Sequence, residues 1–321
     1  MTTPTCYLCN TKLTDDNSSP EHILPNALGG RLKSRTLLCK SCNSDCGDTI
    51  DAALINQLMP LANALNIERE RGDVPPVRVT LASGEQMRRD ADGNMCPYDG
   101  RPVVTEGDGS AQFSISSPSI KQARKHVEGL KRKYPKLDVE AVMATARATT
   151  TRVNTGITFE FPPLGGAEAF RAIVKIAVGY YLHFGGSAGH ISEAIDVLVR
   201  DALPPVSRVG LLYATDPMLR RDNGIVTHVV ALVACEDGTL QAYVELFSAF
   251  RFVVNLADAY SGPPVRTVYC YDVCARREVV VDEAALLGSP WTPEDWDPEA
   301  LGEVLEPVLA VAAERNQRAW G

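Results

Sequence analysis

The segment that decides the N-terminal fold starts at Cys6-Tyr-Leu-Cys9 and ends at Cys39-Lys-Ser-Cys42. Each pair has C-x2-C spacing, which lets a tight turn direct two thiolates at one point, and two such turns supply four sulfur ligands for Zn²⁺. The segment has few large apolar side chains, so we expect it to need this metal to stay folded. A redox-active C-x2-C pair and four incidental cysteines are the alternatives, and the repeated spacing favours zinc.

The chain between the two pairs contains Glu21-His22-Ile-Leu-Pro, followed by Gly29-Gly30, and Asn43 comes directly after the second pair. Adjacent side chains of an extended segment point to opposite faces, so only a bend or a twisted ribbon would bring Glu21 and His22 to one site. The two glycines permit a tight return of the chain. Apolar residues then repeat at helical spacing over residues 47–58.

This ordered set of elements resembles the HNH endonuclease family of zinc-stapled ββα-metal nucleases, over about residues 6–51. In that family two strands and a helix hold one divalent ion. The resemblance implies that Glu21 and Asn43 are ligands of this ion and that His22 is the general base that deprotonates the attacking water. A loop-packing role is the alternative for His22.

The chain departs from the family at Ser34, where the family usually has its middle Asn. Ser34 would replace that residue in the catalytic site, or nearby Asn26 would do so, or the site is weakened. Asp51 and Asp48 are further candidates for the metal shell, although acidic residues at a helix start also complement the helix dipole. Oxygen ligands suit a catalytic Mg²⁺ or Mn²⁺, and a neutral imidazole suits water activation near neutral pH.

The composition is that of an ordinary globular protein: 321 residues, 45% hydrophobic, 22% charged, with a formal net charge of −8. These values exclude a disordered or low-complexity chain. No apolar run reaches the roughly 18 to 20 residues that span a bilayer, and the N-terminus shows no secretory signal. We therefore expect a cytoplasmic protein without a membrane partner, whose remaining cysteines are packed as small apolar residues.

The pattern of elements predicts an α+β protein in which the zinc-stabilised ββα-metal module precedes a mixed α/β domain with a largely antiparallel sheet. We expect a nuclease module at 1–58, a connector with a small sheet and a basic helix at 59–155, and a recognition or oligomerisation domain at 156–321. A helix is predicted over 167–184, with Arg171 and Lys175 on a solvent-exposed face or against phosphate. Five consecutive strands are predicted over residues 209–213, 226–234, 240–246, 250–256 and 268–271.

Residues 121–136 form a strongly basic run, with seven Lys and Arg residues against one Glu. Phosphate contact by a helix is one interpretation and a solvated helix face is the other. An acidic segment, 282–321, is expected to pack through its tryptophans and to support self-association. The candidate nucleic-acid-binding residues are Lys121, Arg124, Lys125, Lys131, Arg132 and Lys133.

Together these features predict a metal-dependent phosphodiesterase that cleaves DNA, with RNA as the other candidate substrate. Through the resemblance, a role in bacterial antiviral defence or restriction is implied, with a homo-oligomer and a defence-system partner as further expectations. The competing hypothesis is a non-catalytic zinc module that binds nucleic acid or protein, and Ser34 favours it.

Overall fold

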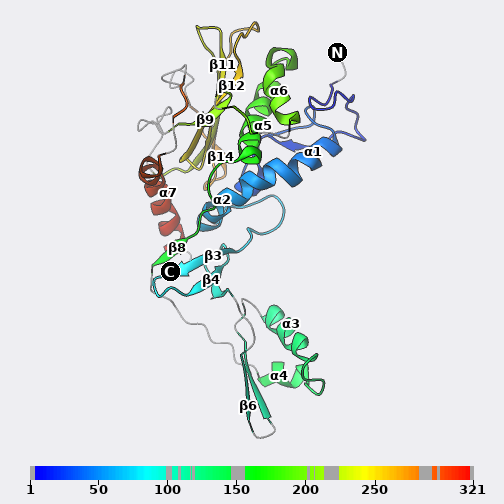
Figure 1. Ribbon diagram of the computed structural model, residues 1–321, viewed down its shortest axis with the longest axis vertical. Helices are drawn as coiled ribbons and strands as arrows, with labels where there is room; N and C mark the ends of the chain where they lie inside the picture. The colour runs from blue at the N-terminus through cyan, green and yellow to red at the C-terminus, as the bar shows by residue number, and fades with distance from the viewer. Residues whose placement is uncertain are drawn as a thin grey trace. The chain divides into compact units, whose positions relative to one another are not determined.

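The protein was analysed as a computed structural model, which describes residues 4–98, 103–107, 110–115, 117, 120–145, 156–200, 203–205, 207–212, 224–281, 291–294 and 297–318. The chain divides into two compact units (Figure 1). One unit combines Met1–Val74 with Pro162–Gly321, and the other is Pro75–Phe161. This division differs from the three expected parts, because the N-terminal segment packs on the C-terminal half and forms one unit with it.

A six-stranded sheet forms the centre of the first unit, with strand order β14-β13-β10-β11-β12-β9. Every neighbouring pair is antiparallel, and β10, β11 and β12 follow one another as a meander. The predicted antiparallel sheet is therefore confirmed. The strands are β9 (Val209–Leu211), β10 (Thr227–Ala234), β11 (Leu240–Leu246), β12 (Phe250–Ala257), β13 (Arg266–Asp272) and β14 (Arg277–Glu278).

Helix α5 (Ala167–His183) covers one face of this sheet, where the rings of Phe170 and Phe252 lie 6.4 Å apart. The opposite face carries an apolar cluster that includes Tyr243 and Trp291. Because both faces are covered, all seven residues of β11 are buried, which accounts for its nearly continuous apolar sequence. Trp291 therefore packs as expected, whereas Trp296 and Trp320 lie outside the described residues.

The N-terminal segment contributes a two-stranded ribbon and a long helical stretch to the same unit. β1 (Glu21–His22) pairs antiparallel with β2 (Lys33–Ser34), and the short 3-10 helix η1 (Asn26–Leu28) lies between them. Gly30 is required here, because a Cβ at this position would lie 2.1 Å from the Leu24 carbonyl oxygen. The helical stretch consists of α1 (Lys40–Cys46), the π-helical turn η2 (Gly47–Asp51) and α2 (Ala52–Ala64).

Helix α5 also packs against η2 and α2, so it lies between the N-terminal helices and the sheet (Figure 1). The 3-10 helix η3 (Ala188–Ile191) and helix α6 (Ser192–Val199) follow it, and α7 (Pro298–Arg318) packs against α2. The sequence patterns predict no helix in the acidic C-terminal segment, so α7 is a finding of the structure.

The second unit contains a four-stranded antiparallel sheet of order β5-β4-β3-β8 and a separate hairpin, β6-β7. Val79, Leu81 and Met87 form a small apolar core in the larger sheet. None of the helices in the described ranges is long and apolar enough to cross a membrane. The elements of this unit are β3 (Val77–Leu81), β4 (Gln86–Arg89), β5 (Met95–Pro97), β6 (Val103–Gly107), β7 (Ser110–Ser114), α3 (Ile120–Leu130), α4 (Val139–Thr145) and β8 (Ile157–Phe159).

Candidate active site

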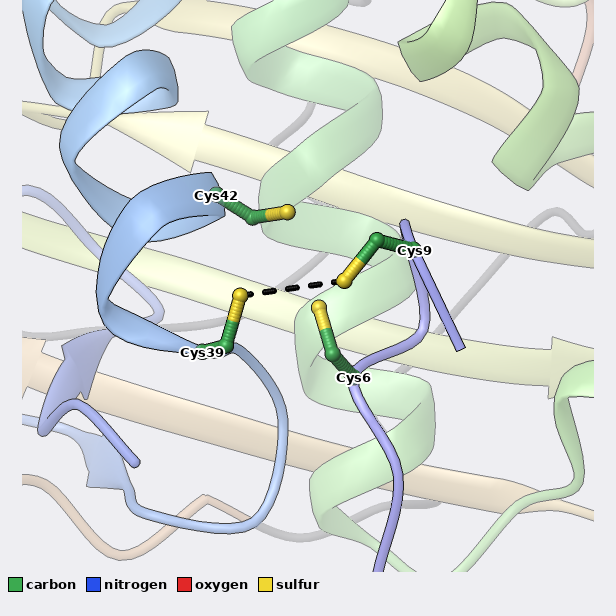
Figure 2. Close-up of side chains that lie close together, drawn as sticks. All are labelled: Cys6, Cys9, Cys39 and Cys42. Atoms are coloured by element: carbon green, nitrogen blue, oxygen red, sulfur yellow. Dashed lines mark hydrogen bonds between the residues drawn. The ribbon is translucent and has the colours of Figure 1, made fainter. Parts of the chain in front are cut away.

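The four cysteines of the two C-x2-C pairs converge on one point, as Figure 2 shows. Their sulfur atoms all lie within 4.8 Å of one another, and the sulfurs of Cys9 and Cys39 are 3.7 Å apart. A tetrahedral site with Zn–S bonds of about 2.3 Å has about 3.8 Å between its sulfurs, so the spacing and the donors both suit a metal ion. Among the described residues, these four cysteines are the one group of three or more His, Cys, Asp or Glu side chains that lie close enough together to hold a metal ion.

Local backbone geometry presents these thiols. Cys39 precedes the first turn of α1 and Cys42 lies within that turn, while Asn10 takes a left-handed conformation, with φ of 59°, directly after Cys9. Hydrogen bonding with Thr11 lowers the pKa of Cys9 to about 6, so this thiol ionises near neutral pH. Burial raises the pKa of Cys42, and only a bound cation would make its thiolate favourable.

The β1–β2 ribbon separates Glu21 from His22. Glu21 pairs with Ser34 and His22 with Lys33, and the side chains of Glu21 and His22 lie on opposite faces of the ribbon. Glu21 is 4% exposed, whereas the His22 side chain is 24% exposed. The ribbon therefore has an inner carboxylate face and an outer imidazole face.

On the inner face, Lys175 from α5 contacts two carboxylates. Its Nζ donates a hydrogen bond to Glu21 Oε1 and another, 2.8 Å long, to Asp51 Oδ2. Burial alone would lower the pKa of Lys175, but Asp51 and Glu21 together raise it above its ordinary value. Burial raises the pKa of Glu21, and Lys175 opposes that shift. The second Asp51 oxygen, Oδ1, is buried without a hydrogen-bond partner among the described residues.

The solvent-exposed position expected for Lys175 is wrong, because α5 is buried all round from Ala172 to Tyr181. A charged residue inside such an apolar run, Ile173-Val174-Lys175-Ile176, is the signal that could have identified it as a paired buried cation. Arg171, one turn earlier, donates to the Leu198 carbonyl oxygen.

Two other predicted site residues form hydrogen bonds with residues other than Glu21, Lys175 and Asp51. Asn43 donates from Nδ2 to Ser19 Oγ over 2.7 Å, which ties the start of α1 to the loop before β1. Ser34 Oγ lies 3.0 Å from Thr36 Oγ1 and accepts the Thr36 backbone N–H. Asp48 is exposed on η2.

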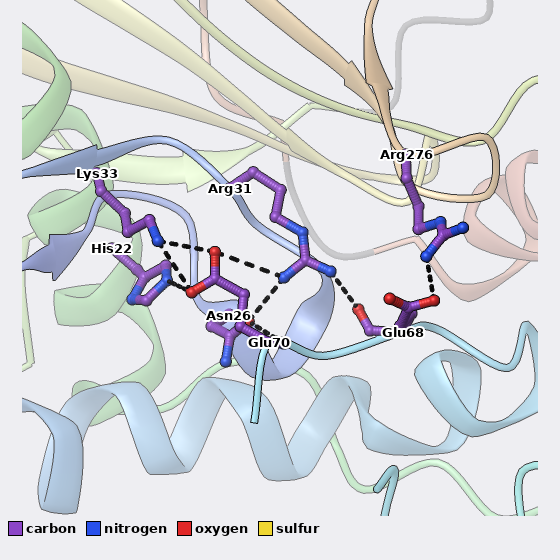
Figure 3. A network of polar contacts seen from close by, with 7 residues as sticks. All are labelled: His22, Asn26, Arg31, Lys33, Glu68, Glu70 and Arg276. Carbon is purple, nitrogen blue, oxygen red and sulfur yellow. Dashed lines mark hydrogen bonds and ion pairs between the residues drawn. The ribbon is translucent and has the colours of Figure 1, made fainter. Parts of the chain in front are cut away.

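On the outer face, His22 Nε2 lies 3.1 Å from Glu70 Oε2 (Figure 3). Lys33 Nζ donates to both oxygens of the same carboxylate, at 2.8 and 3.0 Å. Burial lowers the pKa of His22, and the hydrogen bond to Glu70 acts in the opposite direction. The sequence predicted only a connector at Glu70, and nothing in the local pattern links it to His22.

The basic run lies in the second unit. Helix α3 carries Lys121, Arg124 and Lys125, and the turn after it carries Lys131, Arg132 and Lys133. Arg124 forms an ion pair with Glu140 of α4. The side chains of Lys121, Lys125, Lys131, Arg132 and Lys133 are exposed.

No curated protein and no solved structure matches the chain. Residues 6–59 match the HNH endonuclease family. This segment contains the four cysteines, Glu21, His22 and Asn43.

Proposed function

We propose that this protein is a metal-dependent HNH-type endonuclease that hydrolyses phosphodiester bonds of DNA. The observation that carries the proposal is the family match over residues 6–59, which includes the partly exposed His22 and the converging cysteines. We assign a structural Zn²⁺ to Cys6, Cys9, Cys39 and Cys42. The proposed zinc site fixes the start of α1 against the loop before β1, and so supports the ribbon that presents His22.

His22 is the general base of the proposed reaction. Its imidazole accepts a proton from water, the water oxygen forms a bond to phosphorus, and the bond from phosphorus to the leaving oxygen breaks. The leaving oxygen takes a proton from solvent. The lowered pKa of His22 keeps the imidazole neutral at pH 7, which is the form that can accept this proton.

A catalytic Mg²⁺ or Mn²⁺ would be held by Glu21 and Asp51, which Lys175 brings together, with the side-chain oxygen of Asn43, whose Nδ2 bonds to Ser19, as the third ligand. The donor set fits a hard cation, because all three residues supply oxygen ligands and Asp51 Oδ1 is buried without a partner among the described residues. When bound, such an ion offsets charge that develops on the phosphate and on the leaving oxygen. Lys175 competes for the same carboxylates, so the ion would share them with its ammonium group or displace it.

The basic surface formed by Lys121, Lys125, Lys131, Arg132 and Lys133 supports a phosphate-binding role for α3 and the turn after it. Arg124 serves this role less directly, because Glu140 neutralises it. We further propose a cytoplasmic protein that acts in bacterial defence or restriction, as a homo-oligomer and with a partner of that system. The defence or restriction role rests on the family resemblance.

A non-catalytic zinc module that binds nucleic acid or protein is the second candidate. The bond of Lys175 to both Glu21 and Asp51 favours it, because the ammonium group already neutralises the carboxylates assigned to the divalent ion. Ser34 in place of the family's middle Asn points in the same direction.

A cleavage panel decides between the two. Purified protein is incubated with supercoiled plasmid, linear duplex, single-stranded DNA and RNA, with Mg²⁺, Mn²⁺ or EDTA. We expect nicking of DNA that needs a divalent ion and that falls by about 10² to 10⁴ in His22→Ala. His183→Ala is the matched control, since His183 is exposed on α5 and lies outside the matched segment.

Absence of cleavage of every substrate with either ion would leave the non-catalytic module as the function. Equal activity of His22→Ala and the wild type would contradict the role of His22 as general base.

A further inference from the structure

The imidazole of His22 has two nitrogens, and the structure distinguishes them. Nε2 faces Glu70 Oε2 at 3.1 Å. An ionised carboxylate only accepts hydrogen bonds, so the nitrogen that contacts it must carry the proton. In the neutral imidazole the other nitrogen, Nδ1, then has a free lone pair, and that nitrogen is the one able to take a proton from water.

Glu70 is held in the ionised form that accepts this hydrogen bond from His22 Nε2. The hydrogen bond from Lys33 lowers the pKa of Glu70, so the carboxylate is ionised at neutral pH. Lys33 sits opposite His22 in the ribbon register, and it binds both oxygens of the carboxylate. Arg31 Nη1 lies 3.8 Å from Glu70 Oε1. The one carboxylate therefore lies among an imidazole, an ammonium and a guanidinium (Figure 3).

The backbone at Glu68–Glu70 is also anchored to the loop that follows β1. Asn26 Oδ1 accepts the Glu70 backbone N–H at 3.0 Å and a hydrogen bond from Arg31 Nη1 at 3.1 Å. Arg31 Nη2 donates to the Glu68 carbonyl oxygen at 3.0 Å. These bonds fix the chain on both sides of Arg69, so the Glu70 side chain reaches His22 from a constrained backbone. Such a preorganised contact is what a positioning residue needs.

The charge balance of the cluster suits an anionic substrate. Glu70 contributes one negative charge, while Lys33 and Arg31 contribute two positive charges. The outer face of the ribbon thus keeps a net positive charge beside His22, and the added carboxylate does not make it repel phosphate.

We propose that Glu70, which lies outside the segment that matches the family, is a positioning residue that holds the His22 imidazole as the Nε2–H tautomer and leaves Nδ1 as the proton acceptor. This inference deepens the proposed nuclease function and rests on it for its catalytic meaning. The placement of the imidazole itself is tested without any cleavage assay.

The first experiment reads the imidazole directly by ¹H–¹⁵N NMR of the full-length, zinc-loaded protein. The chain has five histidines, and comparison with His22→Ala assigns the His22 signals. We expect wild-type His22 to be the Nε2–H tautomer, with an Nε2 proton that exchanges slowly because it is bonded to a carboxylate. In Glu70→Ala this proton should exchange rapidly, and the Nδ1–H form should rise because Lys33 can then donate to Nε2. Glu70→Gln keeps a side-chain acceptor and should restore the Nε2–H form in part.

Glu68→Ala is the matched control, because Glu68 lies in the same segment but pairs with Arg276. It should leave the His22 signals unchanged. An Nδ1–H tautomer in the wild type, or identical His22 signals in the wild type and Glu70→Ala, would overturn the inference.

The second experiment measures cleavage by the same variants. Glu70→Ala should lower kcat by about 10- to 100-fold without raising KM, Glu70→Gln should recover part of the loss, and Glu68→Ala should match the wild type. An unchanged kcat in Glu70→Ala would overturn the positioning role even if the tautomer shifts. If the wild type cuts nothing, the nuclease proposal fails, while the NMR result still decides whether Glu70 sets the tautomer.

Discussion

His228 should make the first unit lose stability on mild acidification. The residue lies on β10 and is 0% exposed. Its Nδ1 accepts the Phe247 backbone N–H at 3.1 Å, so Nε2 carries the proton and donates to the Leu28 carbonyl oxygen at 2.8 Å. Both nitrogens are thus satisfied only in the neutral form. A second proton on Nδ1 would place two hydrogen-bond donors, this N–H and the Phe247 backbone N–H, opposite each other.

These contacts matter because they join distant segments. Leu28 belongs to η1 of the N-terminal segment, and Phe247 lies in the turn between β11 and β12. Phe247 has a φ of 55° and Ser248 a φ of 59°, conformations that are strained for residues other than glycine. Protonation of His228 would therefore remove a bond that supports a strained turn.

The magnitude follows from the pKa. Burial lowers the pKa of His228 from 6.5 to about 4, while the Leu28 carbonyl and Glu245 oppose the shift. Since the folded pKa lies below the unfolded one, the unfolded chain binds more protons between these values, and stability falls as the pH falls from about 6.5 toward 4. At about 1.4 kcal/mol per pH unit, the full loss is about 3 kcal/mol, and about 2 kcal/mol of it is lost by pH 5.

The assay is urea unfolding of the wild type and His228→Gln at several pH values between 8 and 5, followed by circular dichroism. Gln keeps a donor for Leu28 but does not titrate. Other titrating groups act in both proteins and cancel in the difference between their free energies of unfolding. We expect the wild type to lose about 2 kcal/mol more than the variant over this range. His183→Gln, an exposed control, should follow the wild type. A constant difference between the wild type and His228→Gln would refute the reasoning.

Three further predictions concern the metal site, the buried lysine and the basic surface. Cys39→Ser should reduce bound zinc from about one ion per chain to near zero in metal analysis and should lower Tm, because three sulfurs cannot complete the tetrahedral site; full zinc retention would contradict the assignment. Lys175→Met should lower the free energy of unfolding by about 3 to 5 kcal/mol, because it leaves Glu21 and Asp51 uncompensated. Mg²⁺ or Mn²⁺ should restore part of this loss if these carboxylates bind the ion. An unchanged Tm would argue against the pairing. Lys131→Ala should weaken DNA binding and reduce the slope of log K against log salt by about 1; an unaltered slope would remove this residue from the interface.

The sequence by itself determined the parts of the protein that depend on neighbours along the chain. Two C-x2-C turns can meet in few ways other than around a metal, so their spacing predicted the cluster. Apolar runs separated by short turns predicted the strands of the meander, because consecutive antiparallel strands pair through local connections. Alternation along a strand also predicted that Glu21 and His22 face apart unless the segment bends, and in the paired ribbon they lie on opposite faces.

Only the tertiary structure decided which residues complete each face of the ribbon. Lys175 reaches Glu21 across a sequence separation of 154 residues, and Glu70 reaches His22 across 48. No local period records such pairs, because they arise when α5 packs on η2 and when the segment at Glu68–Glu70 is bonded to Asn26 and Arg31. The joining of the N-terminal segment and the C-terminal half into one unit has the same origin. Periodicity and spacing report the short-range preferences of the chain, whereas the partners of buried charges are set by how complete elements pack against one another.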